Sequence, residues 1–202
     1  MRPFAFLAGL ILAPLLLVLG GAYALSATGG GGVGGNKVQL AQELAAAADD
    51  GRLTGILPDH IKEIRWIAQG QAVPNCDVDV RVLQVLVLAL RKFESVGISD
   101  INRHCTGQAS VGAGLTSSHW TGRAVDIIAL SGRVLDGADG QSTRLISMLD
   151  PLMPSGSRIG QSNCRASEGT ALALENLTEF SDSCDHLHVD LAFAGDKPLT
   201  GL

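Results

Sequence analysis

Aromatic residues are scarce in this chain, at 4% of 202 residues, and basic residues form no run or stripe. The 15 Lys and Arg are outnumbered by 20 Asp and Glu, so the formal net charge is −5. Proteins that bind nucleic acid cluster Lys and Arg against the phosphates. The composition therefore argues against a nucleic-acid partner. The length suits one ordinary domain plus a terminal segment.

Charged residues are also absent from positions 4–21, a stretch dominated by Leu, Ala and Val. Arg2 precedes this stretch, and Ala22-Tyr23-Ala24 follows it with the small-x-small pattern of signal-peptide cleavage. Its length is also close to that of a membrane span. We therefore interpret residues 1–27 as a signal peptide or a membrane anchor, with residues 4–24 as the tether in the second case. Both interpretations place the remainder outside the cytoplasm, secreted or on the outer face of the cell membrane, in the cell envelope.

The sequence also lacks the C-x2-C spacing that is typical of structural zinc sites. Its cysteines are Cys76, Cys105, Cys164 and Cys184. An even number of cysteines in an exported chain indicates disulfides, and four cysteines allow three pairings. We expect Cys76 to pair with Cys105 and Cys164 with Cys184, as nearest neighbours in the chain. A cysteine zinc site is the alternative.

Two further segments come after residues 1–27. Residues 28–36 are a Gly-rich linker, and residues 37–202 form the folded domain. Apolar periodicity, with Asp59 and Asp79 as helix N-caps and Gly97 as a stop, predicts helices at 38–48, 59–69, 79–95 and 142–149. β-Branched content and alternation predict strands at 124–130 and 186–193. The expected fold class is α+β, with a small antiparallel sheet that carries the functional site and is flanked by helices.

Residues that carry chemistry are concentrated in two short motifs. The first is SSHWTGRAVD at 117–126, and the second is CDHLHVD at 184–190. Together they contain three of the five histidines in the chain. A strand through the second motif places His186, His188 and Asp190 on one face, because side chains two apart in a strand point the same way.

The first motif requires a turn. His119 and Asp126 are seven residues apart, which is about 23 Å in a strand and about 10 Å in a helix. Neither geometry lets both reach one metal ion, so the chain must fold back between them, and Gly122 permits that turn. Two His and one Asp are a reasonable ligand set for catalytic zinc, Zn²⁺, with the fourth position left for water. His186 is then a candidate base beside the metal.

The pattern S-x-H-x-x-G-x-A-x-D followed by H-x-H resembles the signature of the D-Ala-D-Ala metallopeptidase and murein endopeptidase group. That group is named from lysostaphin, D-Ala-D-Ala metallopeptidases and sonic hedgehog. The resemblance covers residues 79–193, and its motif residues here are Ser117, His119, Gly122, Ala124, Asp126, His186 and His188.

The resemblance implies a role for each of several residues. It makes His119, Asp126 and His188 the zinc ligands. It makes His186 the group that acts on water or on the transition state. An upstream Arg of the group holds the substrate carbonyl, and Arg103 stands near the expected position. Some members instead use an acid three residues before the last zinc His, where this chain has Asp185; strand alternation favours His186 over Asp185.

The resulting hypothesis is a zinc-dependent hydrolase that cleaves peptide bonds in peptidoglycan stem peptides or cross-links. The sequence leaves open whether it is a carboxypeptidase or an endopeptidase, and it leaves the oligomeric state open. Two alternatives remain. One is a binding module of the cell envelope that retains zinc without catalysis, and the other is a membrane-tethered structural component.

Overall fold

The computed structural model describes residues 33–200 of the chain. The expected signal peptide or anchor at 1–27 and most of the linker at 28–36 lie outside these residues. Within residues 33–200, no helix is both long enough and apolar enough to cross a membrane.

The helices follow the periodicity of the sequence closely. They are α1 (Lys37–Asp49), α2 (Ile61–Ala68), α3 (Val80–Lys92), α4 (Arg103–Thr106), α5 (Gly140–Leu149) and α6 (Ser162–Ser167). The 3-10 turns are η1 (Gly114–Thr116), η2 (Ser118–Thr121), η3 (Asp150–Leu152) and η4 (Ala192–Ala194). Asp79 caps α3 by accepting a hydrogen bond from the Arg81 backbone N–H at 2.9 Å. Asp59 accepts the first N–H groups of α2 in the same way, although His60 is the residue directly before that helix.

The predicted stop of the third helix at Gly97 is wrong. The helix ends at Lys92, since Phe93 adopts an extended backbone and turns its ring into the core. Gly97 instead lies inside strand β2 (Val96–Asp100), where a Cβ would stand 3.1 Å from the Cβ of Ala129. The glycine is needed there for a close strand contact.

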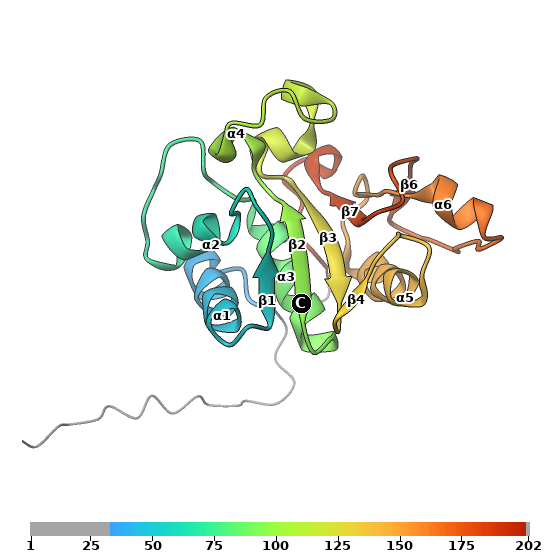
Figure 1. Ribbon diagram of the computed structural model, residues 1–202, viewed down its shortest axis with the longest axis horizontal. Helices are drawn as coiled ribbons and strands as arrows, with labels where there is room; N and C mark the ends of the chain where they lie inside the picture. Colours follow the sequence, from blue (N-terminus) through green and yellow to red (C-terminus); the bar gives the residue numbers. More distant parts are fainter. Residues whose placement is uncertain (1–32, 201–202) are drawn as a thin grey trace, which may run out of the picture. The chain divides into compact units, whose positions relative to one another are not determined.

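The strands form one seven-stranded sheet (Figure 1). They are β1 (Leu53–Gly55), β2, β3 (Ala124–Leu130), β4 (Arg133–Val134), β5 (Arg158–Ile159), β6 (Thr178–Glu179) and β7 (Leu187–Asp190). Their order is β1-β2-β3-β7-β5-β6, and β4 pairs with β3. The strand expected at 186–193 is shorter, because the chain turns into η4 after Leu191.

The sheet is mixed, so the expected purely antiparallel sheet is wrong. The expected combination of one sheet with helices is present. Strands β1 and β2 are parallel, as are β5 and β6, whereas β2, β3, β7 and β5 pair antiparallel. A parallel pair needs a crossover connection, and α2 and α3 form that connection between β1 and β2. Strand β1 has only three residues, too few to show the alternation from which a strand is predicted.

Helix α3 lies at the centre of the core. Its apolar side chains are buried around nearly the whole axis, as predicted. Figure 1 shows α3 behind β1 and β2, and α1 contacts α2, α3 and β1. Helix α3 packs against β2, and β2 pairs with β3; the two strands carry part of the candidate site.

Both expected disulfides are present. Cys76 is bonded to Cys105, which ties the segment before α3 to α4, and Cys164 is bonded to Cys184, which ties α6 to the segment before β7. No cysteine is free. The alternative of a cysteine zinc site is therefore wrong.

Candidate metal centre

The candidate site lies on a row of side chains that crosses the sheet. Asp100 on β2 is the register partner of Asp126 on β3, and Asp126 is the partner of His188 on β7. Partners in adjacent strands lie on the same face of a sheet. The row therefore places a carboxylate and an imidazole side by side, although 62 residues separate them in the chain.

His119 reaches this row from η2. Ser117 caps η2, and the chain reverses at Gly122, whose φ is +65°. A Cβ at Gly122 would stand only 2.3 Å from the Asp77 carbonyl oxygen, so both space and backbone angle require glycine. The turn brings His119, which is 1% exposed, onto Asp126.

Three donor atoms meet at one point. His119 Nε2 lies 3.1 Å from Asp126 Oδ1 and 3.2 Å from His188 Nδ1, and His188 Nδ1 lies 2.8 Å from Asp126 Oδ1. Ligands at 2.0–2.1 Å from a tetrahedral metal are about 3.3 Å apart. The spacing and the mixture of imidazole and carboxylate fit a divalent metal ion, and these residues form a group that could hold one.

The protonation of the site follows from its charges. Burial would raise the pKa of Asp126, but His119, His186 and His188 hold it well below its usual range. Burial would lower the pKa of His119, but Asp126 outweighs burial and raises it. The carboxylate is therefore ionised, as metal binding requires.

A buried polar chain stands behind His119. Its Nδ1 lies 3.2 Å from the Ile101 carbonyl oxygen, a contact in which Nδ1–H donates and Nε2 is left for the cluster. Asp100 Oδ1 lies 3.6 Å from His119 Nδ1 and 3.4 Å from His60 Nε2, and His60 Nδ1 lies 2.9 Å from Glu63 Oε1.

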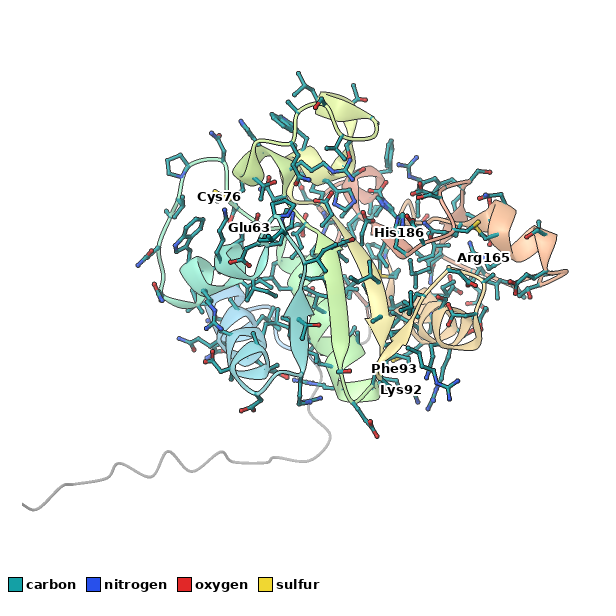
Figure 2. All side chains as sticks on the ribbon, viewed as in Figure 1. Glu63, Cys76, Lys92, Phe93, Arg165 and His186 are labelled. Carbon is teal, nitrogen blue, oxygen red and sulfur yellow. A yellow bond between two sulfur atoms is a disulfide. The ribbon has the colours of Figure 1, made fainter. Side chains whose placement is uncertain are left out.

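Each of these side chains is at least nine-tenths buried. Burial raises the pKa of Glu63, although His60 opposes the rise. Within residues 33–200, Asp100 Oδ1 has no hydrogen-bond partner. Its charge therefore acts on the two imidazoles through electrostatics alone. In the view of Figure 2, Glu63 lies to the left of β2 and His186 to the right of β3.

His186 lies directly before β7 and points at the cluster. Its Nε2 is 3.3 Å from Asp126 Oδ1 and 3.6 Å from Asp182 Oδ2, and its Nδ1 is 2.7 Å from Asp185 Oδ1. Burial disfavours the charged imidazole, but the three carboxylates outweigh burial and raise the pKa of His186 to about 11. A metal cation on Asp126 would oppose that effect, because it would offset the nearest negative charge.

Gln161 is a residue that the sequence analysis missed. It is fully buried and holds φ at +64°, which is uncommon for a residue with a side chain. Its Oε1 accepts the His188 backbone N–H at 3.0 Å, and its Nε2 lies 3.1 Å from His186 Nε2. A Cβ at Gly137 would overlap Gln161, so the glycine makes room for this side chain.

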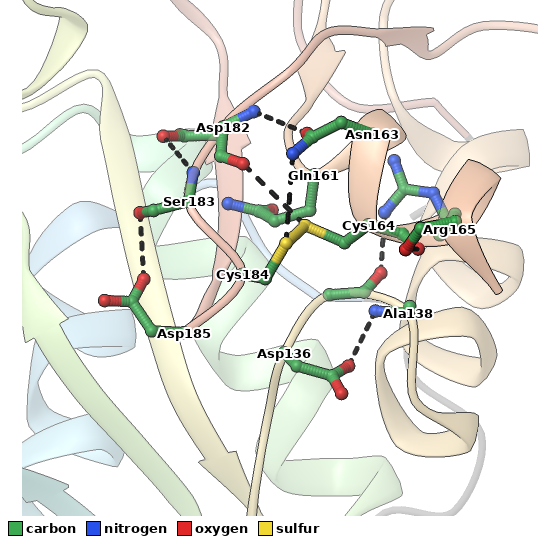
Figure 3. Close-up of a disulfide and its surroundings, with 12 residues drawn as sticks. Asp136, Ala138, Gln161, Asn163, Cys164, Arg165, Asp182, Ser183, Cys184 and Asp185 are labelled. Carbon is green, nitrogen blue, oxygen red and sulfur yellow. Dashed lines mark hydrogen bonds between the residues drawn. A yellow bond between two sulfur atoms is a disulfide. The ribbon is translucent and has the colours of Figure 1, made fainter.

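Asp182 was also missed, and it occupies a place that Asp185 does not. The Asp185 side chain is 76% exposed and is not part of the cleft wall, whereas Asp182 lines the cleft. Figure 3 shows how the segment is held: the Cys164–Cys184 disulfide fixes it to α6, and Asn163 Oδ1 accepts the Asp182 backbone N–H at 3.0 Å. No short motif marks Asp182, because its role depends on this fixed loop.

Arg103 stands at the other side of the site. It pairs with Asp100, donates through Nη1 to the Val111 carbonyl at 3.1 Å and to Ser117 Oγ at 3.3 Å, and its Nη2 lies 3.8 Å from Asp126 Oδ2. The arginine named in the sequence analysis is thus within reach of the cluster.

The cluster opens into a cleft of about 390 Å³. The cleft contains all three candidate ligands together with Arg103 and His186, and its wall is lined by Val111, Gly112, Ala113, Thr116, Ser117, Ser118, Arg158, Phe180, Asp182, Ser183 and Asp190. A metal held by three protein ligands here would keep one side toward the cleft, which is the arrangement of catalytic rather than structural zinc.

Comparison of the chain with protein-family models, with curated proteins and with solved structures finds no match.

Proposed function

We propose that this protein is a zinc-dependent peptidase that hydrolyses peptide bonds in peptidoglycan stem peptides or cross-links. The observation that carries the proposal is the triangle of His119 Nε2, Asp126 Oδ1 and His188 Nδ1, with sides of 2.8–3.2 Å, at the floor of an open cleft. The peptidoglycan substrate comes from the sequence resemblance and from the apolar N-terminus. Zinc at this triangle would activate water and polarise the scissile carbonyl.

His186 is the proton carrier in this proposal. Asp185 Oδ1 accepts from its Nδ1–H, which leaves Nε2 as the nitrogen that would take up a proton, 3.3 Å from Asp126 Oδ1 and 3.1 Å from the Gln161 amide nitrogen. This is the arrangement of a general base that a carboxylate orients. His186 takes a proton from the attacking water and passes it to the leaving amine. Asp182 and Asp185 stabilise the charged imidazole between the two transfers.

Arg103 is the carbonyl-positioning residue in this proposal. Its guanidinium is fixed by Asp100, Val111 and Ser117, so it meets the substrate in one orientation. A fixed donor aimed at developing negative charge lowers the barrier without reorganisation.

The test is incubation of the purified protein with muropeptides, with zinc or with a chelator, and mass analysis of the products. Loss of a terminal D-Ala or cleavage of a cross-link, only with zinc, is the expected result. Zinc-loaded protein that leaves every muropeptide intact would favour the second candidate, a zinc-retaining binding module. Intact His186, with its carboxylate and amide partners, favours the enzyme, because metal binding alone does not require it.

A further inference from the structure

Arg158, the first residue of β5, keeps part of its guanidinium free at the cleft. A guanidinium has five N–H groups. Nε donates to Asp190 Oδ2 at 3.0 Å, and Nη2 donates to the same oxygen. For the remaining three N–H groups, the described residues 33–200 provide no hydrogen bond. The side chain is 31% exposed and lines the cleft.

Two buried arginines, and the other arginine of the cleft, behave differently. Arg165, labelled in Figures 2 and 3, is 1% exposed, and each of its three nitrogens donates within the protein. Arg81 is 4% exposed at its side chain and is saturated in the same way. Across the cleft, Arg103 donates through Nε to Asp100 and through Nη1 to the Val111 carbonyl, and its Nη2 lies beside Asp126. Of the two arginines that line the cleft, Arg158 is thus the one with several N–H groups that no described residue accepts.

The guanidinium of Arg158 is held rigidly although it is partly exposed. Asp190 is completely buried and fixes one edge. The Phe193 ring centroid lies 3.5 Å from the guanidinium carbon, and the Phe180 centroid lies 4.9 Å from it. Because aromatic rings stack on the flat faces of the guanidinium, its N–H groups at the edge remain accessible to a ligand. A rigid donor loses little conformational entropy when it binds an anion.

The register of β5 and β7 places Arg158 next to the metal triangle. Arg158 is the partner of Asp190, so His188 faces Gly160, two residues from Arg158 and on the same face. Two residues of strand span about 7 Å. Arg158 also lines the same cleft as the three candidate ligands. The free carboxylate at the end of a peptide whose scissile carbonyl lies at the triangle therefore has Arg158 as a cationic partner in the same cleft.

We propose that Arg158 is the receptor for a free C-terminal carboxylate, which makes the protein a carboxypeptidase rather than an endopeptidase. This inference rests on the proposed peptidase function. Arginine forks match carboxylates in geometry and charge. Asp190 and Asp182 reduce the positive potential, so the site suits a single negative charge rather than a phosphate dianion. A peptide that continues beyond the cleaved bond has no carboxylate there and gains nothing from Arg158.

The test uses the full chain loaded with zinc and two peptides ending in D-Ala-D-Ala, one with a free carboxylate and one with a carboxamide. Wild-type protein is expected to show kcat/KM about 10- to 100-fold higher for the acid, the range of a charge-assisted hydrogen bond. Arg158→Gln alone leaves the buried Asp190 charge unpaired, so the decisive variant is Arg158→Gln with Asp190→Asn. Its acid-to-amide ratio should fall toward one.

Arg133→Gln, an exposed residue on β4, is the matched control and should keep the wild-type ratio. A double variant that keeps the wild-type ratio, or wild-type protein that prefers the amide, overturns the carboxylate receptor but leaves the peptidase intact. If zinc-loaded wild-type protein cleaves neither peptide and leaves every muropeptide intact, the proposed function fails, and calorimetric binding of the two peptides decides the receptor; if it cleaves only cross-links, the carboxypeptidase assignment is overturned and the peptidase remains. Tighter binding of the acid that is lost in the double variant supports Arg158, and equal binding overturns it.

Discussion

His188 lies directly opposite Asp126 on the neighbouring strand, and the two side chains meet with His188 Nδ1 2.8 Å from Asp126 Oδ1. Strand pairing holds both backbones, so neither side chain needs to move to form a metal site. His119 completes the set from a turn that only glycine permits at Gly122. Such a prearranged site predicts specific outcomes for metal content, rate, affinity and stability.

The purified protein should bind one zinc ion per chain, and His119→Ala or His188→Ala should remove it. Each change deletes one of three donors and leaves Asp126 with a single imidazole ligand. Metal analysis after dialysis is the measurement. His104→Ala is the matched control, because His104 is exposed and stacks on Trp120 outside the cleft. Full zinc content in either ligand variant would exclude this metal site.

His186→Ala should keep its zinc and its melting temperature while it loses turnover by about 10²- to 10⁴-fold, the usual contribution of a general acid–base group. Asp185→Ala should lose less, because Asp185 acts through His186 and Asp182 still faces Nε2. Muropeptide turnover and metal analysis on the same samples test both. An inactive Asp185→Ala beside a nearly normal His186→Ala would reverse the two roles. Loss of zinc from His186→Ala would mean a closed four-ligand site.

Asp100→Asn should weaken zinc binding by about 10- to 100-fold, the effect of losing a group that orients a metal ligand. Its negative charge faces His119 Nδ1 and also holds Arg103. Competition with a chelator measures the affinity. Asp150→Asn, which removes an equally buried carboxylate at the end of α5, is the control for stability and should leave zinc affinity unchanged. Equal affinities in both variants would show that the buried chain is structural only.

Asp139 should make stability depend on pH at the start of α5. Burial would raise its pKa, but hydrogen bonds from Ser142, Gln141 and the Asp136 backbone outweigh burial and lower it. A lowered folded-state pKa stabilises the protein fully above the unfolded value of about 3.9, and the gain is lost as pH falls through the folded value.

Replacement of this cap, Asp139→Ala, should cost about 0.5–2 kcal/mol at pH 7. The difference from wild type should shrink as pH falls below about 4 and through the lowered folded-state pKa of the carboxyl. Urea unfolding at several pH values measures both. A constant difference from pH 7 to pH 2.5 would contradict the charge-based explanation.

The protein should contain no reactive thiol when it is unfolded without reductant, because both disulfides are formed. Replacing Cys164 and Cys184 by Ser should cost about 3 kcal/mol, the chain-entropy value for a loop of this length. Turnover should fall as well, since the bridge fixes the segment that carries Asp182 and Asp185. The double Cys76→Ser and Cys105→Ser variant is the comparison. If the Cys164 and Cys184 variant loses stability but keeps its rate, the disulfide does not position the residues of the cleft.

Several features of this protein could be predicted from local sequence. Asp79 begins a helix because its side chain accepts a hydrogen bond from a helix-terminal N–H, and the strand at 124–130 follows from its β-branched residues. The nearest-neighbour pairing of the cysteines was also confirmed. The two histidine motifs identified every residue of the donor triangle.

Tertiary structure decided what lies around those motifs. The parallel pairing of β1 with β2 depends on a crossover through two helices, and a three-residue strand carries no periodicity of its own. Asp182 faces the cleft because a disulfide fixes its loop, and Gln161 reaches His186 from a backbone angle that no composition indicates. Arg158 joins the cleft through the register of β5 on β7. Register between distant strands is set by packing of the whole core, whereas sequence patterns report only the local periodicity of each segment.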